Sequence, residues 1–316
     1  MSRTVLFIGG PGRNGSTLLD LLLGRLDGFV SVGELRFLWE RGLIENRLCG
    51  CGAALRSCPF WSEVLQLGFG DRGAADARKM LALQRRLERK ACVPAVALGQ
   101  GSPTFRRDLR EYRAVLSRLY RAICDVSGAT VVVDSSKYPP HGLILSELED
   151  LDLRTIDLVR DPRAVAFSWR RRKRLVEVHW EARDMAVRHP AVAARGWLLS
   201  KALMRVLGRH ARSQLTLRYE DFVTEPIDAI RNIVAGWADV SVDSSIFEAR
   251  ESSHTVSGNP IRHESGPIVL KPDLAWQREL SRADFATVTA MTWPLLLAYG
   301  YPLLRPRANV AASPSP

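Results

Sequence analysis

The segment from Gly9 to Thr17 has the composition of an anion-binding loop. It follows the apolar run 5–8 and reads Gly-Gly-Pro-Gly-Arg-Asn-Gly-Ser-Thr. Glycines let the backbone turn sharply and bring its N–H groups close to an anion. A helix that begins near Ser16 would add the positive end of its dipole, and the hydroxyls of Ser16 and Thr17 would add donors. We therefore predict a phosphate-binding loop; the alternative is an ordinary tight turn between a strand and a helix.

This loop differs at its cation from the nucleoside-triphosphate loop G-x-x-x-x-G-K-[ST]. Gly10 and Gly15 have the required spacing and Thr17 takes the last position, but Ser16 stands where that loop has lysine. The cation lies inside the loop instead, at Arg13. A kinase would lack the lysine that reaches the β- and γ-phosphates, so the pattern favours another phosphate ligand.

A second strand-to-helix junction, at 160–168, offers another anion site. It reads Arg-Asp-Pro-Arg-Ala-Val-Ala-Phe-Ser, with Asp161 suited to the helix N-cap and Pro162 to the first helical position. Arg160 could form charge-assisted, bidentate hydrogen bonds with a phosphate. The alternative is a capped surface helix with a solvated basic face, because the basic run Arg170–Arg174 follows.

In this order, the two motifs resemble those of the PAPS-dependent sulfotransferases, which take a sulfuryl group from 3′-phosphoadenosine 5′-phosphosulfate (PAPS). The resemblance implies that Arg13 stabilises the departing phosphate and that Arg160 and Ser168 contact the 3′-phosphate. It also implies that Arg262, in the turn-rich segment 257–262, closes over the nucleotide; a solvated surface turn is the alternative. The residues implied to hold the 5′-phosphosulfate are Gly12, Arg13, Asn14, Gly15, Ser16 and Thr17.

Glu34 is the candidate general base for accepting the proton of an attacking hydroxyl. It follows Gly33 and a predicted short strand, Phe29–Val32, so it should lie at the carboxyl edge of the sheet. Its role as base is implied by resemblance to the bacterial and tyrosyl-protein sulfotransferases. The alternative is a charge at the N-terminus of a helix over Leu35–Arg41, where it would interact with the helix dipole.

The run Thr-Val-Val-Val-Asp-Ser-Ser-Lys at 130–137 is another strand that ends in polar residues. Its Asp134 mimics the aspartate that holds Mg²⁺ in kinases, which is the best argument for a kinase. The sulfotransferase interpretation instead places Lys137 at the transferring sulfuryl group and uses Ser135 or Ser136 to orient substrate. His141 is an alternative base, although its spacing is more typical of a histidine on a helix surface.

Three cysteines form the pattern C-G-C-G-x₅-C at Cys49, Cys51 and Cys58. A zinc site usually has four ligands, so one would be missing. Cys92, Cys124 or a histidine could supply it. The alternative is a tight loop of reduced cysteines.

Alternating strands and helices predict an α/β fold of the P-loop NTPase-like, three-layer type, with a central parallel sheet and a helical insertion. We expect a single domain over 1–305 with the insertion at about 41–126, and a disordered tail over 306–316 that is rich in Ala, Ser and Pro. Strands are predicted at Thr4–Ile8, Phe29–Val32, Thr130–Val133, Leu153–Val159 and Gln214–Tyr219. Helices are predicted at Ser16–Arg25, Met80–Lys90, Phe105–Asp125, Pro140–Glu149, Pro162–Arg174, Val187–His210 and Ser281–Leu297, the last bent or ended by Pro294.

The net charge of +11 favours anionic partners without choosing among them. The sequence has no apolar run of membrane-spanning length and no signal-peptide core, and its odd number of cysteines, five, fits a reducing compartment, so we expect a cytoplasmic protein. We expect sulfuryl transfer from PAPS, without a required metal, to a hydroxyl or amine of a small-molecule, glycan or lipid acceptor bound within 41–125. The alternatives are an ATP-dependent small-molecule kinase and a basic nucleic-acid-binding protein, although the chain has no nucleic-acid recognition motif.

Overall fold

The computed structural model describes residues 3–70, 76–172, 174–237, 240–248, 253–264 and 266–305. The predicted tail at 306–316 lies outside these ranges. Within them, no helix is long and apolar enough to cross a lipid bilayer.

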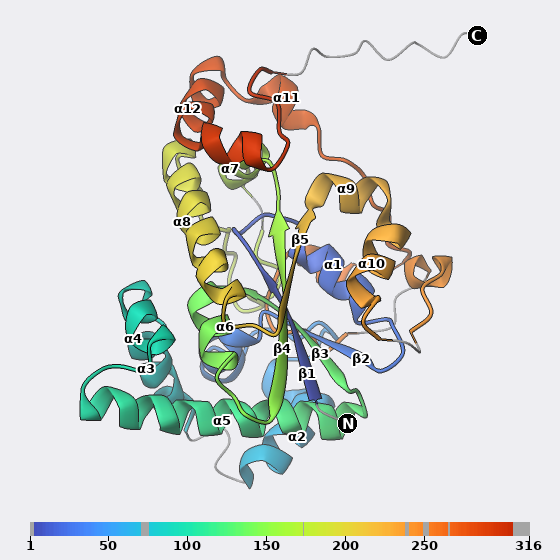
Figure 1. Ribbon diagram of the computed structural model, residues 1–316. Helices are drawn as coiled ribbons and strands as arrows, with labels where there is room; N and C mark the ends of the chain where they lie inside the picture. The colour runs from blue at the N-terminus through green and yellow to red at the C-terminus, as the bar shows by residue number, and fades with distance from the viewer. Residues whose placement is uncertain are drawn as a thin grey trace.

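A parallel sheet forms the centre of the molecule (Figure 1). Among the described residues it has five strands in the order β2-β3-β1-β4-β5. Every neighbouring pair is parallel, so the predicted α/β fold is confirmed. All the strands therefore end at one edge of the sheet. The strands are β1 (Arg3–Gly9), β2 (Phe29–Gly33), β3 (Val131–Lys137), β4 (Leu151–Val159) and β5 (Ser213–Arg218).

Helices cover both faces of the sheet, which explains why β1 is apolar without interruption from Val5 to Ile8. Val5 and Phe7 pack on one face, against α5 (Pro103–Ser127), α6 (Pro139–Leu145) and α8 (Pro190–Gly208). Leu6 and Ile8 pack on the other face, against α1 (Ser16–Leu23), α9 (Tyr219–Thr224) and α10 (Pro226–Val234). Successive residues of a strand point to opposite faces, so one apolar run supplies both halves of the core.

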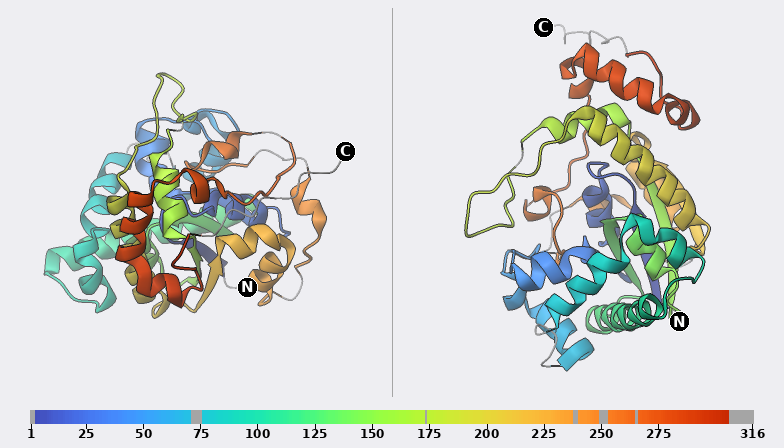
Figure 2. Two further views of the ribbon diagram at one scale, coloured as in Figure 1. Left: turned by 90° about the horizontal axis from the view of Figure 1, so that it is seen from above. Right: turned by 90° about the vertical axis from the view of Figure 1, so that its left-hand side faces the viewer.

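A mostly helical segment connects β2 to β3, where the sequence predicts an insertion. Its long helix α5 begins at a Ser102 N-cap and ends before Gly128. Figure 2 shows these helices at the opposite end of the molecule from the C-terminal helices α11 and α12. The other elements of the segment are η1 (Leu35–Phe37), η2 (Leu38–Ile44), η3 (Leu55–Ser57), α2 (Pro59–Phe69), α3 (Ala77–Leu87), η5 (Lys90–Cys92) and α4 (Val93–Ala97).

The C-terminal part packs helices beside the end of β4. Helix α7 (Pro162–Arg170) and α8 share small apolar clusters with α12 (Arg282–Ala298). Helix α12 continues through Pro294 to Ala298, so of the two predicted effects, a bend or an end of the helix, the second does not occur. Packing of Val288 and Leu296 against α7 and α8 holds both halves of α12. The remaining elements are η6 (Ser244–Phe247), η7 (Pro260–His263) and α11 (Ala275–Glu279).

Candidate active site

The carboxyl ends of four strands bring the predicted chemistry to one edge of the sheet. The phosphate loop follows β1, Glu34 follows β2, Lys137 ends β3 and Arg160 follows β4. These strands are neighbours in the sheet, so the residues that follow them lie side by side. Open parallel sheets bind their ligands at this edge.

The phosphate loop is held in its shape by the side chain of Asn14. The buried amide of Asn14 donates to the carbonyl oxygen of Leu158, 3.0 Å away, and approaches that of Gly9 at 3.4 Å. Its oxygen accepts from the backbone N–H of Ser16 at 3.2 Å. Gly10 has a φ of 127°, and a Cβ there would lie 2.5 Å from the Leu158 oxygen, so only glycine fits. Asn14 thus uses its polar atoms to shape the loop and to fasten it to the end of β4.

The guanidinium of Arg13 is the clearest sign of an anion site. Its Nε and Nη2 atoms are buried and find no hydrogen-bond partner among the residues that the structure describes. The group lies 4.9 Å from the ring centre of Trp169, and Arg188 stacks on the same ring at 4.1 Å. Burial lowers the pKa of Arg13, Glu34 raises it, and Arg188 lowers it further. Buried donors without partners are rare in proteins and mark a position where an anion would restore the hydrogen bonds.

Glu34 and Lys137 form an ion pair beside the loop. Nζ of Lys137 lies 2.5 Å from Oε1 of Glu34, and 14% and 13% of these side chains are exposed. Gly33 has a φ of 70°, and the N–H of Glu34 donates to the Val256 carbonyl at 2.8 Å. The Glu34 side chain makes no capping hydrogen bond to the turn that follows it. Its contact with Lys137 therefore favours a role in chemistry over the helix-cap alternative.

Lys137 adopts a φ of 63°, which is uncommon for a residue other than glycine. Such backbone strain concentrates at functional sites because the surrounding structure must hold it in place. Here it directs the side chain of the last β3 residue toward Glu34. The structure thus brings together Arg13, Glu34 and Lys137, the three predicted catalytic residues.

His141 is buried, so its expected position on a helix surface is wrong. Only 1% of its side chain is exposed. Its Nδ1 lies 2.7 Å from Oε1 of Glu88, and its Nε2 lies 3.7 Å from Oδ2 of Asp134. Burial opposes its charge, but Glu88 and Asp134 raise the pKa of His141 to about 9. A charged, enclosed histidine is poorly placed to accept a proton from an acceptor, so this geometry does not favour it as the base.

The polar end of β3 also belongs largely to this buried cluster. Asp134 accepts hydrogen bonds from the hydroxyls of Tyr120 and Ser136, and it is fully buried. The Ser136 hydroxyl accepts in turn from the backbone N–H of Arg36 at 3.0 Å. Ser135 is buried as well. These contacts do not favour Asp134 as a Mg²⁺ ligand or the two serines as substrate-orienting groups.

Arg160 links the second predicted anion motif to the phosphate loop. Its Nη1 donates to the carbonyl oxygen of Arg13 and its Nη2 pairs with Asp273, both at 3.0 Å. Its Nε is buried and has no partner among the described residues. Asp161 caps α7 through the N–H of Arg163, as predicted, and Ser168 lies buried two turns further along this helix. Arg160 therefore retains one donor and one exchangeable ion pair for a ligand.

Arg262 has a different environment from the one expected. It is fully buried, and its Nη2 donates to the carbonyl oxygen of Leu48 at 2.7 Å and pairs with Glu177 at 3.1 Å. Its Nη1 donates to the Thr255 carbonyl. These contacts fix the C-terminal segment to the insertion and use both terminal nitrogens of the guanidinium, so that only its buried Nε has no partner among the described residues. The segment itself does reach the loop, because the N–H of Asn259 donates to the Thr17 hydroxyl at 3.3 Å.

Several residues at this edge carry no sequence signal that would have found them. Trp169 follows the predicted motif directly, and a Cβ on Gly12 would lie 2.9 Å from its ring. Arg188 lies in a long loop without a motif. Tyr219 stacks on Arg160 at 4.5 Å. The sequence does not show that these aromatic side chains lie against arginines, because the fold alone determines that contact.

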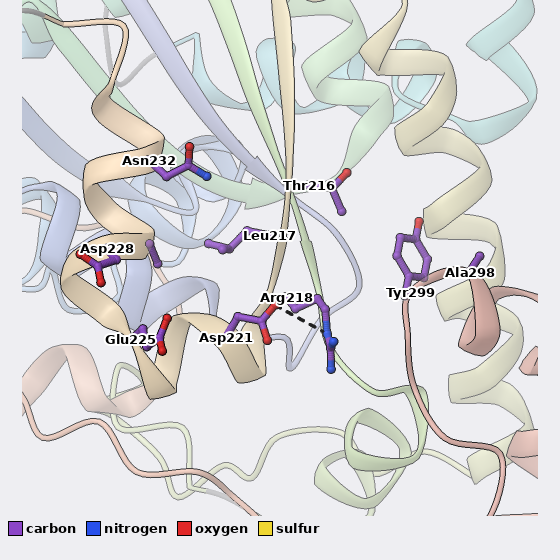
Figure 3. A pocket seen from close by; sticks show the side chains of 10 residues that line it. Thr216, Leu217, Arg218, Asp221, Glu225, Asp228, Asn232, Ala298 and Tyr299 are labelled. Carbon is purple, nitrogen blue, oxygen red and sulfur yellow. Dashed lines mark ion pairs between the residues drawn. The ribbon is translucent and has the colours of Figure 1, made fainter.

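A separate hollow lies beside β5 and is drawn in Figure 3. It is lined by residues of β5, α9, α10 and the end of α12. Its polar groups include Arg218 and Asp221, whose side chains approach to 3.8 Å. Of the described residues that line it, none belongs to the predicted site, and we assign it no role in the chemistry.

A parallel sheet with a glycine-rich loop after its first strand is an arrangement in which α/β proteins often bind phosphate groups. The sequence model described as "Sulfotransferase family" matches residues 6–242, and the chain belongs to this family. The fold is similar to that of the sulfotransferase domain of the Synechococcus PCC 7002 olefin synthase. That domain aligns with a TM-score of 0.53 and 20% identity over 95% of each chain.

Two further solved structures also match. The sulfotransferase domain from the curacin biosynthetic pathway aligns with a TM-score of 0.48 and 16% identity, over 96% of this chain and 99% of that one. The sulfotransferase STF9 from Mycobacterium avium aligns with a TM-score of 0.46 and 13% identity, over 97% of this chain and 79% of that one. No curated protein matches the chain.

Proposed function

We propose that this sulfotransferase uses PAPS as its donor and transfers the sulfuryl group in line to a hydroxyl or amine. The observation that carries this proposal is the convergence of Arg13, with two buried N–H groups lacking described partners, on the Glu34–Lys137 pair. The phosphate loop would hold the 5′-phosphate through its backbone N–H groups and the N-terminus of α1. Arg160 and Ser168 would hold the 3′-phosphate.

Each of the three converging residues has a distinct task in this mechanism. Glu34 accepts the proton of the acceptor as the new S–O or S–N bond forms. Lys137 and Arg13 stabilise the negative charge that develops on the oxygen bridging the sulfuryl and phosphate groups. When the donor binds, the Lys137 ammonium moves from Glu34 to the sulfuryl oxygens, which frees the carboxylate to act as base. Fixed cations suffice for a group that carries less negative charge than a phosphoryl, so this scheme requires no metal.

The acceptor in this proposal is a small molecule, glycan or lipid that approaches from the insertion. The protein would work in the cytoplasm, where its five free cysteines stay reduced.

The kinase alternative has less support, because Asp134 is buried and hydrogen-bonded and because Ser16 stands where the nucleoside-triphosphate loop has lysine. A nucleic-acid interface has little support as well. Arg170 of the basic run pairs with Asp284, and Arg174 lies 3.9 Å from Asp184.

Calorimetry with adenosine 3′,5′-bisphosphate (PAP), ADP and ATP, with and without Mg²⁺, tests the proposal. We expect PAP to bind without metal and about tenfold or more tightly than ADP, because each charge-assisted hydrogen bond to the 3′-phosphate contributes ~1.5–3 kcal/mol. Arg160→Ala should remove this preference, so that the variant binds PAP and ADP with similar affinity. Equal affinity of the native protein for PAP and ADP would contradict the proposal.

A further inference from the structure

Three cysteines and a histidine from distant parts of the chain meet at one point. Cys49 and Cys51 lie in the loop before η3, and Cys58 directly precedes α2. The fourth residue, His254, comes 196 residues after Cys58. Their ligand atoms all lie within 4.8 Å of one another. The histidine supplies the fourth group that the cysteine pattern alone lacks.

The distances between these atoms suit a tetrahedral metal ion. Two sulfurs bound at ~2.3 Å to a tetrahedral zinc are ~3.8 Å apart. Sγ of Cys51 lies 3.7 Å from Sγ of Cys58, and Sγ of Cys58 lies 3.2 Å from Nδ1 of His254. A Cys₃His set is one of the common compositions of structural zinc sites.

The surroundings orient the ligands as an outer shell does in metal sites. The imidazole of His254 stacks on Phe60 with ring centres 4.9 Å apart and an angle of 10° between planes. The indole N–H of Trp61 donates to the carbonyl oxygen of His254 at 2.8 Å. Phe60 and Trp61 lie two and three residues after Cys58, so the start of α2 fixes the ring and the backbone of the fourth ligand together.

A buried cation also lies near the site and offsets part of its charge. Three thiolates and one Zn²⁺ carry a net negative charge. The guanidinium of Arg262 is buried close enough to Cys49 to interact with it electrostatically, in addition to its pairing with Glu177. This contact gives Arg262 a structural function that its position in a turn-rich segment did not indicate.

We propose that Cys49, Cys51, Cys58 and His254 bind one structural zinc ion. All four coordination positions are filled by protein, so the ion has no open position for substrate and lies outside the transfer chemistry. The metal crosslinks the insertion to the segment 253–257. The same segment joins the sheet, because the N–H of Val256 donates to the Val32 carbonyl at 2.8 Å. Gly50 adds a hydrogen bond from its N–H to the Thr255 carbonyl at 3.0 Å.

Metal analysis of the full-length protein, expressed in zinc-supplemented medium and purified with a thiol reductant, tests the site. We expect about one zinc per chain, released by a thiol-modifying reagent. Substitution by Co²⁺ should give thiolate-to-cobalt charge-transfer bands and the intense visible bands of a tetrahedral ion. Hydrogen exchange at the amides of Gly50 and Val256 should accelerate when a strong zinc chelator removes the ion. These measurements do not involve turnover, so their outcome tests the zinc site independently of the proposal that PAPS is the donor.

Matched variants distinguish zinc binding by these four residues from zinc binding by other cysteine thiols of the chain. Cys51→Ser should lower zinc affinity at least about 100-fold, more than the ~10–100-fold cost of changing an outer-shell residue. His254→Cys keeps four ligands and should retain zinc with an altered cobalt spectrum. Cys92→Ser is the control, because the Cys92 thiol contacts the Arg86 carbonyl at 3.4 Å, away from the cluster. Zinc-free native protein, or equal zinc content in Cys51→Ser and Cys92→Ser, would overturn the proposal.

Discussion

Two carboxylate–cation pairs lie near the ends of β2 and β3, and they differ in access to solvent. Glu34 and Lys137 meet at the carboxyl edge of the sheet, beside the unpartnered donors of Arg13. Glu88 and His141 meet inside the molecule, where each side chain is 1% exposed. The residue types are similar in both pairs. Their surroundings therefore decide which carboxylate can exchange a proton with a bound acceptor.

The inner pair is held by many more hydrogen bonds. Glu88 also accepts from the Tyr112 hydroxyl at 3.0 Å and pairs with Arg36 at 2.6 Å. Burial raises the pKa of Glu88, but His141 and Arg36 lower it below its ordinary value. A fully paired carboxylate of this kind stabilises the arrangement of its neighbours and has no lone pair available for a substrate. Among the described residues Glu34 has one charged partner, Lys137, which the proposed donor would displace.

Replacing the outer carboxylate should produce the largest change in activity. Glu34→Gln keeps the size of the side chain but cannot accept a proton. A general base contributes typically ~10²–10⁴-fold in rate, so we expect kcat to fall by about that factor. PAP affinity should barely change, because in the proposed mechanism Glu34 contacts the acceptor and not the nucleotide. Steady-state kinetics and calorimetry on this variant measure both quantities.

Two further variants control this measurement. Glu40→Gln makes the same chemical change at an exposed carboxylate that pairs with Arg85, and it should leave kcat near the native value. Arg13→Ala should lower both turnover and PAP affinity, because Arg13 belongs to the loop that we propose holds the donor. Near-native turnover of Glu34→Gln would contradict the role of Glu34 and return attention to His141.

Replacing the inner carboxylate should change stability more than chemistry. Glu88→Gln leaves a buried charged histidine and Arg36 without their carboxylate, and breaking such pairs costs about 3–5 kcal/mol. Denaturant unfolding should show this loss. Glu147→Gln is the control, since this half-exposed residue lies 3.5 Å from Arg113 and should cost less than about 1 kcal/mol. If the folded Glu88→Gln variant lost as much turnover as Glu34→Gln, the assignment of a structural role to the inner pair and a catalytic role to the outer pair would be wrong.

The sequence predicted Glu34 and Lys137 as separate candidates, and their ion pair is a finding of the structure. Apolar runs locate the strands, and a parallel sheet brings their carboxyl ends together, so Glu34 was expected at this edge, whereas Lys137 was assigned its position through the family resemblance. The same reasoning located the phosphate loop and the Asp161 cap. These features depend on local pattern and on one rule of topology.

The inner cluster and the burial of Arg262 could not be predicted in this way. Glu88 lies 53 residues from His141, and Arg262 lies 85 residues from Glu177. No periodicity or turn signal specifies such partners, because irregular segments of the insertion and of the C-terminal part bring them together. For the same reason the cysteine pattern did not identify His254.

Asp20 is another buried carboxylate, and unlike Glu34 and Glu88 it forms no ion pair with a described residue. It lies on α1, accepts a hydrogen bond from the Ser31 hydroxyl at 2.7 Å, and interacts electrostatically with both Asp134 and Lys137. Its Oδ1 is buried without a partner among the described residues. Burial raises the pKa of Asp20 to about 8. The folded protein therefore keeps a proton that the unfolded chain releases near pH 4.

The sign of the resulting pH dependence follows from proton linkage. Between about pH 4 and pH 8 the folded state binds one more proton at this residue, so its contribution to stability decreases as pH rises. Asp20→Asn cannot titrate and should remove this loss. We expect the variant to gain about 1–3 kcal/mol relative to the native protein between pH 5 and pH 8, below the limit of ~1.4 kcal/mol per pH unit for one proton. Urea unfolding of both proteins at the two pH values isolates this residue, since the raised pKa of His141 acts equally in each. A constant difference in stability would show that Asp20 is ionised in the fold, with Lys137 as its effective partner.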